Sequence, residues 1–346
     1  MTGSTVGPRT IVEAAAALRD GSLTSLELTR ACLAAADRLD DTLGTWLARF
    51  DEQAIDRAAA ADAERSVGMD LGPLHGIPLG IKDILATDEG PTTAQSLVLD
   101  PSWGDQGDGP VVGRLREAGA VFVGKTTTME FAIGRPDFDK PFPIPRNPWN
   151  TDRWTGGSSS GTGNGVASGQ ILGGLGTDTA GSVRLPAAYN GITGHKPTFG
   201  LVPKSGCVPL GLSYDHIGPM TRSALDAAIL LDVMAGPDPS DRTTIDRPPG
   251  SYRTVVERGG PDGTGLSGLR IGRLVNDEID RSCAPATRAV FEQAVEDLAG
   301  AGAEIVDVTV PFYRELSAGA FLALEAEAFA WHRHYLVDRW EDYGRP

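Results

Sequence analysis

Several residue types are scarce in this sequence, and each scarcity excludes a class of protein. Cysteine occurs three times in 346 residues, at Cys32, Cys207 and Cys283, without C-x-x-C spacing. This count excludes a disulfide framework and predicts a reducing, cytoplasmic environment. Long apolar runs are also missing, since no segment approaches the ~18 uninterrupted apolar residues of a membrane-spanning helix. The opening MTGSTVGPRT lacks the basic stretch and apolar run of a secretory signal.

Basic residues are outnumbered by acidic ones. The 31 lysines and arginines stand against 46 aspartates and glutamates, which leaves a formal net charge of −15. Nucleic acids and anionic membranes attract basic surfaces, so this balance argues against direct binding to either. Hydrophobic residues make up 40% of the chain, which is enough for a sizeable core.

Alternating apolar and helical patterns predict an α/β fold with a central sheet. Residues 10–66 are predicted to be helical, with capping-box patterns at Thr10–Glu13 and Thr24–Glu27. Further along, LRIGRLV, APATRAVFEQAVEDLAGAG and AEIVDVTV indicate a strand–helix–strand unit. Residues 236–268 are rich in proline, glycine and charge, and this composition predicts a surface excursion or a join between two halves of the sheet.

Two patterns resemble phosphate-binding loops, and their context argues against both. GAVFVGKT, Gly119–Thr126, satisfies the G-x-x-x-x-G-K-[ST] pattern. Its stiff β-branched residues lie between the glycines, where they suit a strand rather than a curled anion-binding loop. GTGNG lacks the full dinucleotide-binding spacing and a preceding strand.

The usual motifs of metal sites and serine hydrolases are absent as well. The five histidines never occur in H-E-x-x-H or another ligand spacing, and no G-x-S-x-G elbow is present. The sequence therefore predicts no metal site and gives no support to a Ser-His-Asp hydrolase.

Two polar loops flank a buried segment and together predict one site. TGGSSSGTGNG, Thr155–Gly165, would be a flexible linker by composition alone. It is followed by VASGQILGGLG, which suits close packing, and then by the second loop TDTAGSVRLPAAYNG. A serine needs a neighbouring base to become a nucleophile, and no histidine accompanies these loops. Lys82, alone among apolar residues in PLGIKDIL, is the candidate, because desolvation favours a neutral amine.

The sequence closely resembles the amidase signature family. The resemblance rests on four segments: GIPLGIKD, RNPWNTDRWTGGSSSGTGNGVASG, LGTDTAGSVRLPAAYNGITGHKPTFG and HIGPMTR. It implies a mixed central sheet covered by helices on both faces, in a single domain of residues 1–346. Within it, residues 10–66 form the helical segment, 67–235 the catalytic core, 236–268 the excursion and 269–346 the remainder of the core.

The same resemblance implies residue roles. Lys82 is the base, Ser158 the bridging residue after a cis peptide bond from Gly157, and Ser182 the nucleophile. The backbone amides of Thr179, Ala180, Gly181 and Ser182 line an oxyanion hole.

For other residues near these motifs, the sequence predicts structural or pocket-lining roles. Asp178 and Arg184 are predicted to brace the second loop. Ala180 stands where many family members have glycine, so the backbone there must accommodate a β-carbon. Part of the substrate pocket is predicted at Met129, Phe131 and Ala132, for which ordinary core packing is the alternative.

The predicted function is hydrolysis of a carbon–nitrogen bond in a small amide or carbamate-like molecule, without cofactor or metal. The partner predicted is that substrate, with no nucleic acid or membrane, and a homodimer is compatible with it. One alternative is the glutaminase subunit of a tRNA-dependent amidotransferase. Another is a nucleotide-binding or scaffolding protein, which depends on GAVFVGKT. Family members usually extend beyond a point such as WEDYGRP, so a truncated C-terminus is also expected.

Overall fold

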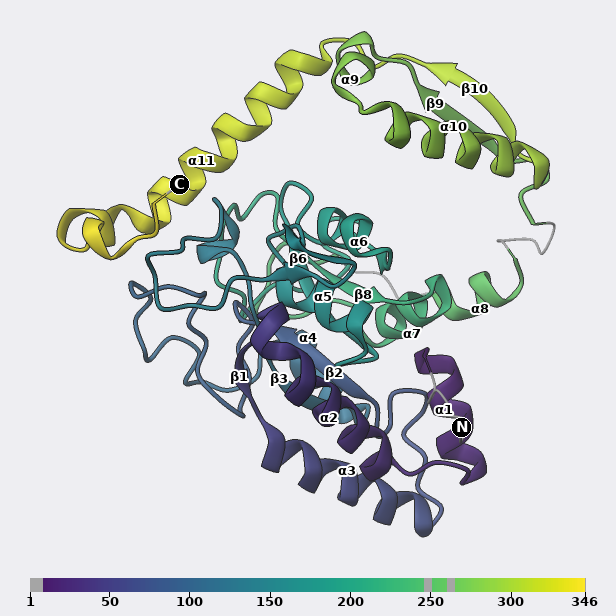
Figure 1. Cartoon of the computed structure of the whole chain (residues 1–346), viewed down its shortest axis with the longest axis vertical. Coiled ribbons are helices and arrows are strands. Elements are labelled where there is room, and N and C mark those ends of the chain that lie inside the picture. Colours follow the sequence, from purple (N-terminus) through teal and green to yellow (C-terminus); the bar gives the residue numbers. More distant parts are fainter. Residues whose placement is uncertain (1–8, 246–250, 260–264, 346) are drawn as a thin grey trace. The chain divides into compact units, whose positions relative to one another are not determined.

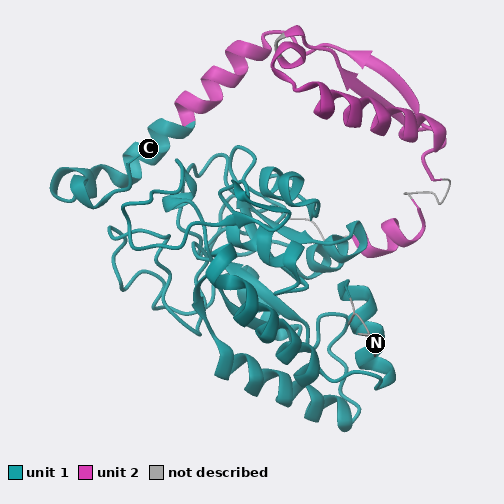
Figure 2. Cartoon of the chain, viewed as in Figure 1, with its two compact units in different colours: residues 1–250, 324–346 teal, residues 251–323 magenta. Residues whose placement is uncertain are grey.

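The computed structural model describes residues 9–245, 251–259 and 265–345. The chain forms two compact units (Figure 2). Unit 1 comprises residues 1–250 and 324–346, and unit 2 comprises residues 251–323. The single domain stays a prediction, and residues 246–250 and 260–264 of the predicted excursion lie outside the described part.

The elements are numbered in chain order, and Figure 1 labels most of them. Those before residue 250 are α1 (Ile11–Asp20), α2 (Ser25–Leu43), β1 (Trp46–Arg49), α3 (Asp51–Ser66), β2 (Pro78–Lys82), α4 (Pro110–Glu117), β3 (Val121–Thr126), η1 (Glu130–Ala132), β4 (Arg146–Asn147), β5 (Asn150–Trp154), α5 (Ser160–Ser168), β6 (Gly173–Asp178), α6 (Arg184–Asn190), β7 (Thr193–Gly194), β8 (His216–Thr221) and α7 (Ala224–Met234). After them come α8 (Tyr252–Glu257), β9 (Arg270–Leu274), α9 (Asp277–Ser282), α10 (Pro285–Gly300), β10 (Glu304–Val308), α11 (Tyr313–Asp338) and η2 (Trp340–Asp342).

Unit 1 is built on a six-stranded sheet in the order β1-β3-β2-β6-β8-β7. Strand β2 runs parallel to β3 and β6, whereas β1, β8 and β7 pair antiparallel with their neighbours. The sheet is therefore mixed, as predicted. Because β2 and β6 are central neighbours, Lys82 at the end of β2 is brought beside the end of β6.

Helices cover both faces of this sheet. A β-carbon added at Gly173 would lie 3.1 Å from Ile11 Cδ1 of α1, whereas one at Gly174 would lie 2.8 Å from Thr162 Cγ2 of α5. Successive strand residues point to opposite faces, so α1 and α5 lie on opposite sides. The prediction of a sheet covered on both faces is confirmed.

The N-terminal segment is helical except for one strand. Both predicted capping boxes are present, at Thr10 and Thr24. The prediction that all of residues 10–66 are helical was wrong at β1, which pairs antiparallel with β3. Gly44, in the left-handed conformation, ends α2, and Trp46 is then buried against Val123 of β3. A four-residue edge strand is too short for its own pattern to stand out between two helices.

Unit 2 contains the predicted strand–helix–strand unit. Strands β9 and β10 pair in parallel, with Arg270 opposite Glu304, and α10 lies between them in sequence. They form a two-stranded sheet of their own. The last part of the chain, from Leu324, belongs to unit 1.

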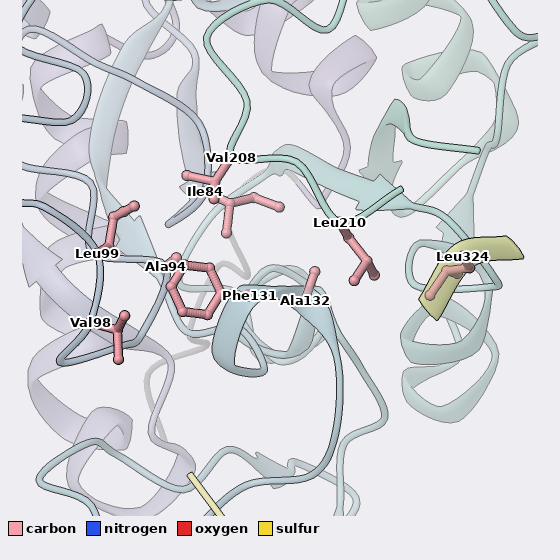
Figure 3. Packing of buried hydrophobic residues seen from close by; sticks show 9 residues of the cluster. All are labelled: Ile84, Ala94, Val98, Leu99, Phe131, Ala132, Val208, Leu210 and Leu324. Atoms are coloured by element: carbon pink, nitrogen blue, oxygen red, sulfur yellow. The ribbon is translucent and has the colours of Figure 1, made fainter. Parts of the chain in front are cut away.

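One apolar cluster of unit 1 joins segments that are far apart in sequence (Figure 3). Phe131 and Ala132 lie in it with Leu324 of α11. The other members of the cluster are Ile84, Ala94, Val98, Leu99, Val208 and Leu210. Among the described helices, none has both the length and the apolarity required to cross a bilayer.

Candidate active site

The glycine-serine run is an ordered turn leading into α5. The peptide bond between Gly157 and Ser158 is cis, as the resemblance implies. Ser158 is fully buried, and its Oγ accepts a hydrogen bond from Lys82 Nζ at 2.6 Å. The linker that composition alone would suggest is therefore excluded.

The next two serines connect this turn to the backbone around it. Ser159 Oγ donates to the carbonyl of Thr177 at 3.2 Å and accepts from the Thr177 amide at 3.1 Å. Ser160 Oγ donates to the carbonyl of Gly156 at 2.7 Å. Of the three consecutive serines, only Ser158 has a hydrogen bond to the lysine within the described structure.

The glycines of the run are required by close packing. A β-carbon at Gly157 would lie 2.3 Å from Met129 Sδ and 2.8 Å from Trp154 Cζ2. One at Gly161 would lie 2.2 Å from the carbonyl oxygen of Thr45. All three distances are shorter than van der Waals contact, so a side chain at either position would displace its neighbours.

Lys82 is buried at the end of β2, and both of its side-chain partners are hydroxyls. Besides Ser158, its Nζ donates to Thr177 Oγ1 at 2.7 Å. Sequence reasoning did not predict a role for Thr177. The available signal was a threonine directly before the loop DTAGS, at the end of a strand made of small apolar residues.

Burial lowers the pKa of Lys82 to about 7, although the Cys207 thiol and the carboxylates of Asp178 and Asp215 oppose the shift. An amine with this pKa is largely neutral in mildly alkaline solution. The neighbouring Asp83 does not hold it charged, since its carboxylate faces Lys125, with 3.7 Å between Asp83 Oδ1 and Lys125 Nζ.

The loop after β6 is organised around Asp178. Its carboxylate accepts hydrogen bonds from the amides of Gly181 and Val183 at 2.8 and 3.2 Å. The Arg184 guanidinium donates to both carboxylate oxygens at 2.9 Å. Burial opposes ionisation, but Arg184 and the backbone amides hold the pKa of Asp178 below its usual value. The predicted bracing by Asp178 and Arg184 is confirmed.

The four predicted oxyanion donors differ in whether their amides are already hydrogen-bonded within the protein. The amide of Gly181 donates to Asp178, which removes it from the set of free donors in this conformation. The amides of Thr179, Ala180 and Ser182 have no protein acceptor among the described residues. The left-handed residue of the loop is Gly181, with φ 125°, so Ala180 keeps a backbone that tolerates its β-carbon.

Ser182 lies where the two loops meet. Its carbonyl accepts a hydrogen bond from the Ser159 amide at 3.1 Å, and its side chain is partly exposed. The two polar loops predicted to form one site are thus adjacent. Within the described residues, no hydrogen bond joins the hydroxyls of Ser158 and Ser182, so their roles stay predictions.

The predicted pocket residues lie at different depths. The Met129 amide donates to the carbonyl of Ser158 at 3.2 Å, which places this residue beside the site. Phe131 and Ala132 are buried in the apolar cluster of Figure 3. Phe131 also lines a cavity of about 320 Å³ together with His332 of α11. Their part in substrate binding stays a prediction.

Two of the histidines, His75 and His332, make structural contacts in the described part of the chain. His75 Nε2 lies 2.6 Å from a carboxylate oxygen of Glu64. His332 Nδ1 lies 2.7 Å from the Tyr343 hydroxyl, and burial lowers the pKa of His332 to about 4. The part of the chain that is described has no group of three or more metal-ligating side chains suited to an ion.

The phosphate-loop pattern is a strand. Residues Val121–Thr126 form β3, and Lys125 Nζ donates to the carbonyl of Leu85 at 2.5 Å and to Thr92 Oγ1 at 2.8 Å. The lysine that would contact phosphate is therefore buried and bound to the protein.

The chain belongs to the amidase family, whose model, described as Amidase, matches residues 27–342. It is 41% identical over 324 residues to a glutamyl-tRNA(Gln) amidotransferase subunit of Chloroflexus aurantiacus, covering 93% of this chain and 64% of that protein. The chain thus spans less than two thirds of the length of this curated relative.

Two solved structures resemble the chain closely. One comes from a vestigial protein complex that reveals the origins of an s-triazine catabolic enzyme; its TM-score is 0.88 at 32% identity, covering 97% of this chain and 71% of that one. The peptide amidase of Stenotrophomonas maltophilia has a TM-score of 0.83 at 33% identity, covering 97% of this chain and 69% of that one.

Proposed function

We propose that the chain hydrolyses a carbon–nitrogen bond of a small amide or carbamate-like molecule through an acyl-enzyme on Ser182. The observation that carries the proposal is the 2.6 Å hydrogen bond from the buried amine of Lys82 to Ser158. An ordinary lysine, with a pKa near 10.4, is almost wholly charged at neutral pH and cannot accept a proton. Burial lowers the pKa of Lys82 to about 7, which makes it a usable base.

The proposed reaction begins with two coupled proton transfers. Neutral Lys82 takes the proton of Ser158 as Ser158 takes that of Ser182, and Ser182 Oγ attacks the carbonyl carbon. The carbon–nitrogen bond then breaks, and the amine leaves with a proton returned through Ser158. Water attacks the resulting ester, which releases the acid and restores the Ser182 hydroxyl.

Backbone amides stabilise the negative charge on the carbonyl oxygen in this mechanism. Thr179, Ala180 and Ser182 supply them, since the Gly181 amide is bound to Asp178. In comparable sites one such donor contributes ~3–4 kcal/mol to transition-state stabilisation. Asp178 acts indirectly, by fixing the loop that carries these amides.

A second candidate function, the glutaminase subunit, is supported more strongly by the sequence relatives. The Chloroflexus relative and that of Thermobifida fusca, 37% identical over 315 residues, share the same description as a subunit of glutamyl-tRNA(Gln) amidotransferase. Under this hypothesis the same chemistry releases ammonia from an amide within a larger assembly. Simple amides would then be poor substrates for the chain alone, and partner proteins would co-purify with it.

Covalent labelling tests the shared chemistry. A fluorophosphonate probe is expected to label the protein at Ser182, and Ser182→Ala should abolish labelling and lower kcat/KM at least a thousandfold. Ser66→Ala, at an exposed serine that ends α3, is the matched control and should keep both. Labelling that persists in Ser182→Ala would refute the assignment of the nucleophile.

A further inference from the structure

Each of the two site serines follows a glycine against which an apolar side chain lies. Trp154 covers Gly157, directly before Ser158, with Cζ2 2.8 Å from where a β-carbon would stand. Leu185 covers Gly181, directly before Ser182, with Cδ1 3.1 Å from the corresponding position. These contacts place an apolar side chain against the residue that directly precedes each site serine.

These side chains are also open to solvent. Trp154 is 37% exposed, Leu185 47% and Tyr189 53%. The rings of Trp154 and Tyr189 meet edge to face, with centroids 6.5 Å apart, and Tyr189 Cδ2 lies 3.1 Å from where a β-carbon of Gly156 would stand. We call Trp154, Leu185 and Tyr189 the apolar rim.

The three rim side chains are uncharged, Arg153 points to the face of β5 opposite Trp154, and Arg146, paired with Trp154, lies over the Phe138 ring at 5.7 Å. Arg184 directly precedes Leu185, but its guanidinium donates two hydrogen bonds to Asp178. The charges of this pair offset each other, so neither attracts an ionic substrate group strongly. Placing a carboxylate against leucine and aromatic rings would cost free energy without a compensating partner. An aromatic or alkyl group would gain free energy there, because it loses contact with water.

We propose that the apolar rim binds an uncharged aryl or alkyl group of the substrate beside the scissile bond, so that amides carrying a carboxylate near the bond are discriminated against. This inference rests on the proposed function and selects between its two candidates, since glutamine carries charged groups. The occupant of the rim is thus the apolar end of the substrate amide itself.

A matched pair of primary amides tests the inference. 3-Phenylpropanamide and succinamate differ in the group at the far end of the same short chain. The expected kcat/KM of the wild-type protein is at least a hundredfold higher for 3-phenylpropanamide. Equal values, or a preference for succinamate, would overturn the inference.

Variants locate the effect on the rim. Leu185→Arg should raise KM for 3-phenylpropanamide at least tenfold, with kcat changed less than threefold. It should therefore reduce the ratio of the kcat/KM values for 3-phenylpropanamide and succinamate. Tyr189→Ala should raise the same KM severalfold. Leu71→Arg, at a leucine of similar exposure ahead of β2, is the control and should change neither constant. An effect of Leu185→Arg on kcat alone would overturn the inference, because it would indicate a displaced serine loop.

A binding measurement covers the case of slow turnover. 2-Phenylethylboronic acid should protect Ser182 from the fluorophosphonate probe at a concentration at least tenfold lower than 2-carboxyethylboronic acid. Equal protection overturns the inference and leaves the serine chemistry standing. Absence of labelling, together with absence of hydrolysis of either amide, overturns the proposed function and the inference with it.

Discussion

Lys82 and Lys125 are both fully buried amines at the ends of neighbouring parallel strands, yet their surroundings differ. Lys125 lies 3.7 Å from the carboxylate of Asp83, which favours its charged form. Lys82 donates to two hydroxyls, Ser158 and Thr177, which do not offset a full charge. Burial lowers the pKa of both, and the difference in partners suits Lys82 alone to proton transfer.

The first prediction at this scale concerns pH. Since catalysis needs neutral Lys82 and its pKa is about 7, kcat/KM should rise about tenfold from pH ~6 to pH ~8 and then level off. Lys82→Met should abolish this rise together with nearly all activity. Lys140→Met is the control, because Lys140 donates to the carbonyls of Glu341 and Asp342 rather than to a serine.

Stability measurements check the same pKa independently of turnover. The folded-state pKa of Lys82 lies below its unfolded value, so between pH ~7 and ~10 the unfolded chain binds more protons at this position. The cost of burying Lys82 is therefore fully present below pH ~7 and falls as pH rises. The free-energy advantage of Lys82→Met over the wild type should shrink across this range. A constant difference would contradict the lowered pKa.

At the scale of elements, small residues decide how closely the helices approach the site. Helix α5, SGTGNGVAS, has three glycines: an alanine methyl at Gly161 would meet backbone atoms, and one at Gly163 or Gly165 would meet neighbouring side chains within 3.3 Å. Glycine has a lower helix propensity than alanine, so these glycines make α5 intrinsically less stable as a helix. In return they allow α5 to pack closely against its neighbours. That packing holds the serine turn against the end of β6.

A pair of glycine-to-alanine variants separates propensity from packing. In Gly161→Ala the new methyl would stand 2.2 Å from the Thr45 carbonyl oxygen and 2.5 Å from the Thr127 amide. We expect the free energy of unfolding to fall by about 2 kcal/mol or more, with loss of activity. Gly113→Ala in α4 has its nearest neighbour, Asp108 Cβ, at 3.9 Å and should gain about 0.5–1 kcal/mol. Chemical denaturation of both variants checks this, and equal destabilisation would contradict the packing argument.

At the scale of the whole molecule, the net charge determines how the chain interacts with polyanions such as RNA. The net charge is −15, so the long-range field repels polyanions. The residues of the candidate site, from Lys82 to Ser182, all belong to unit 1. Under the proposed glutaminase function, the net charge therefore predicts that another protein of the assembly holds the RNA.

This leads to a prediction for binding to RNA. The purified chain should bind tRNA with a Kd weaker than ~10⁻⁴ M at a salt concentration of about 0.15 M, because it lacks the excess of cations that phosphate binding requires. Electrophoretic mobility shifts measure this, with a basic RNA-binding protein as positive control. Micromolar binding would show that charge is distributed on the surface less evenly than the total indicates.

Local patterns in the sequence were enough to predict the family, the α/β fold and the two capping boxes, and they also supplied the candidate residues for the chemistry, whose roles stay predictions. These depend on local patterns: helix caps, apolar periodicity, and the spacing of Lys82 and the two serine loops. Local patterns also sufficed to reject GAVFVGKT as a phosphate loop, since β-branched residues between the glycines favour a strand.

Several contacts could not be predicted from the sequence and depend on the folded chain. The tertiary structure brought Thr177 to Lys82, turned the Gly181 amide toward Asp178, made residues 46–49 an edge strand, and placed Trp154 and Leu185 against the two glycines. The contact of Thr177 with Lys82 and the pairing of β1 with β3 join segments far apart in sequence. The other contacts join residues three or four positions apart and depend on the conformation of the two loops, which their local sequence pattern does not specify. The pKa of Lys82 has the same origin, because desolvation comes from all the elements that surround a buried group and not from its neighbours in the chain.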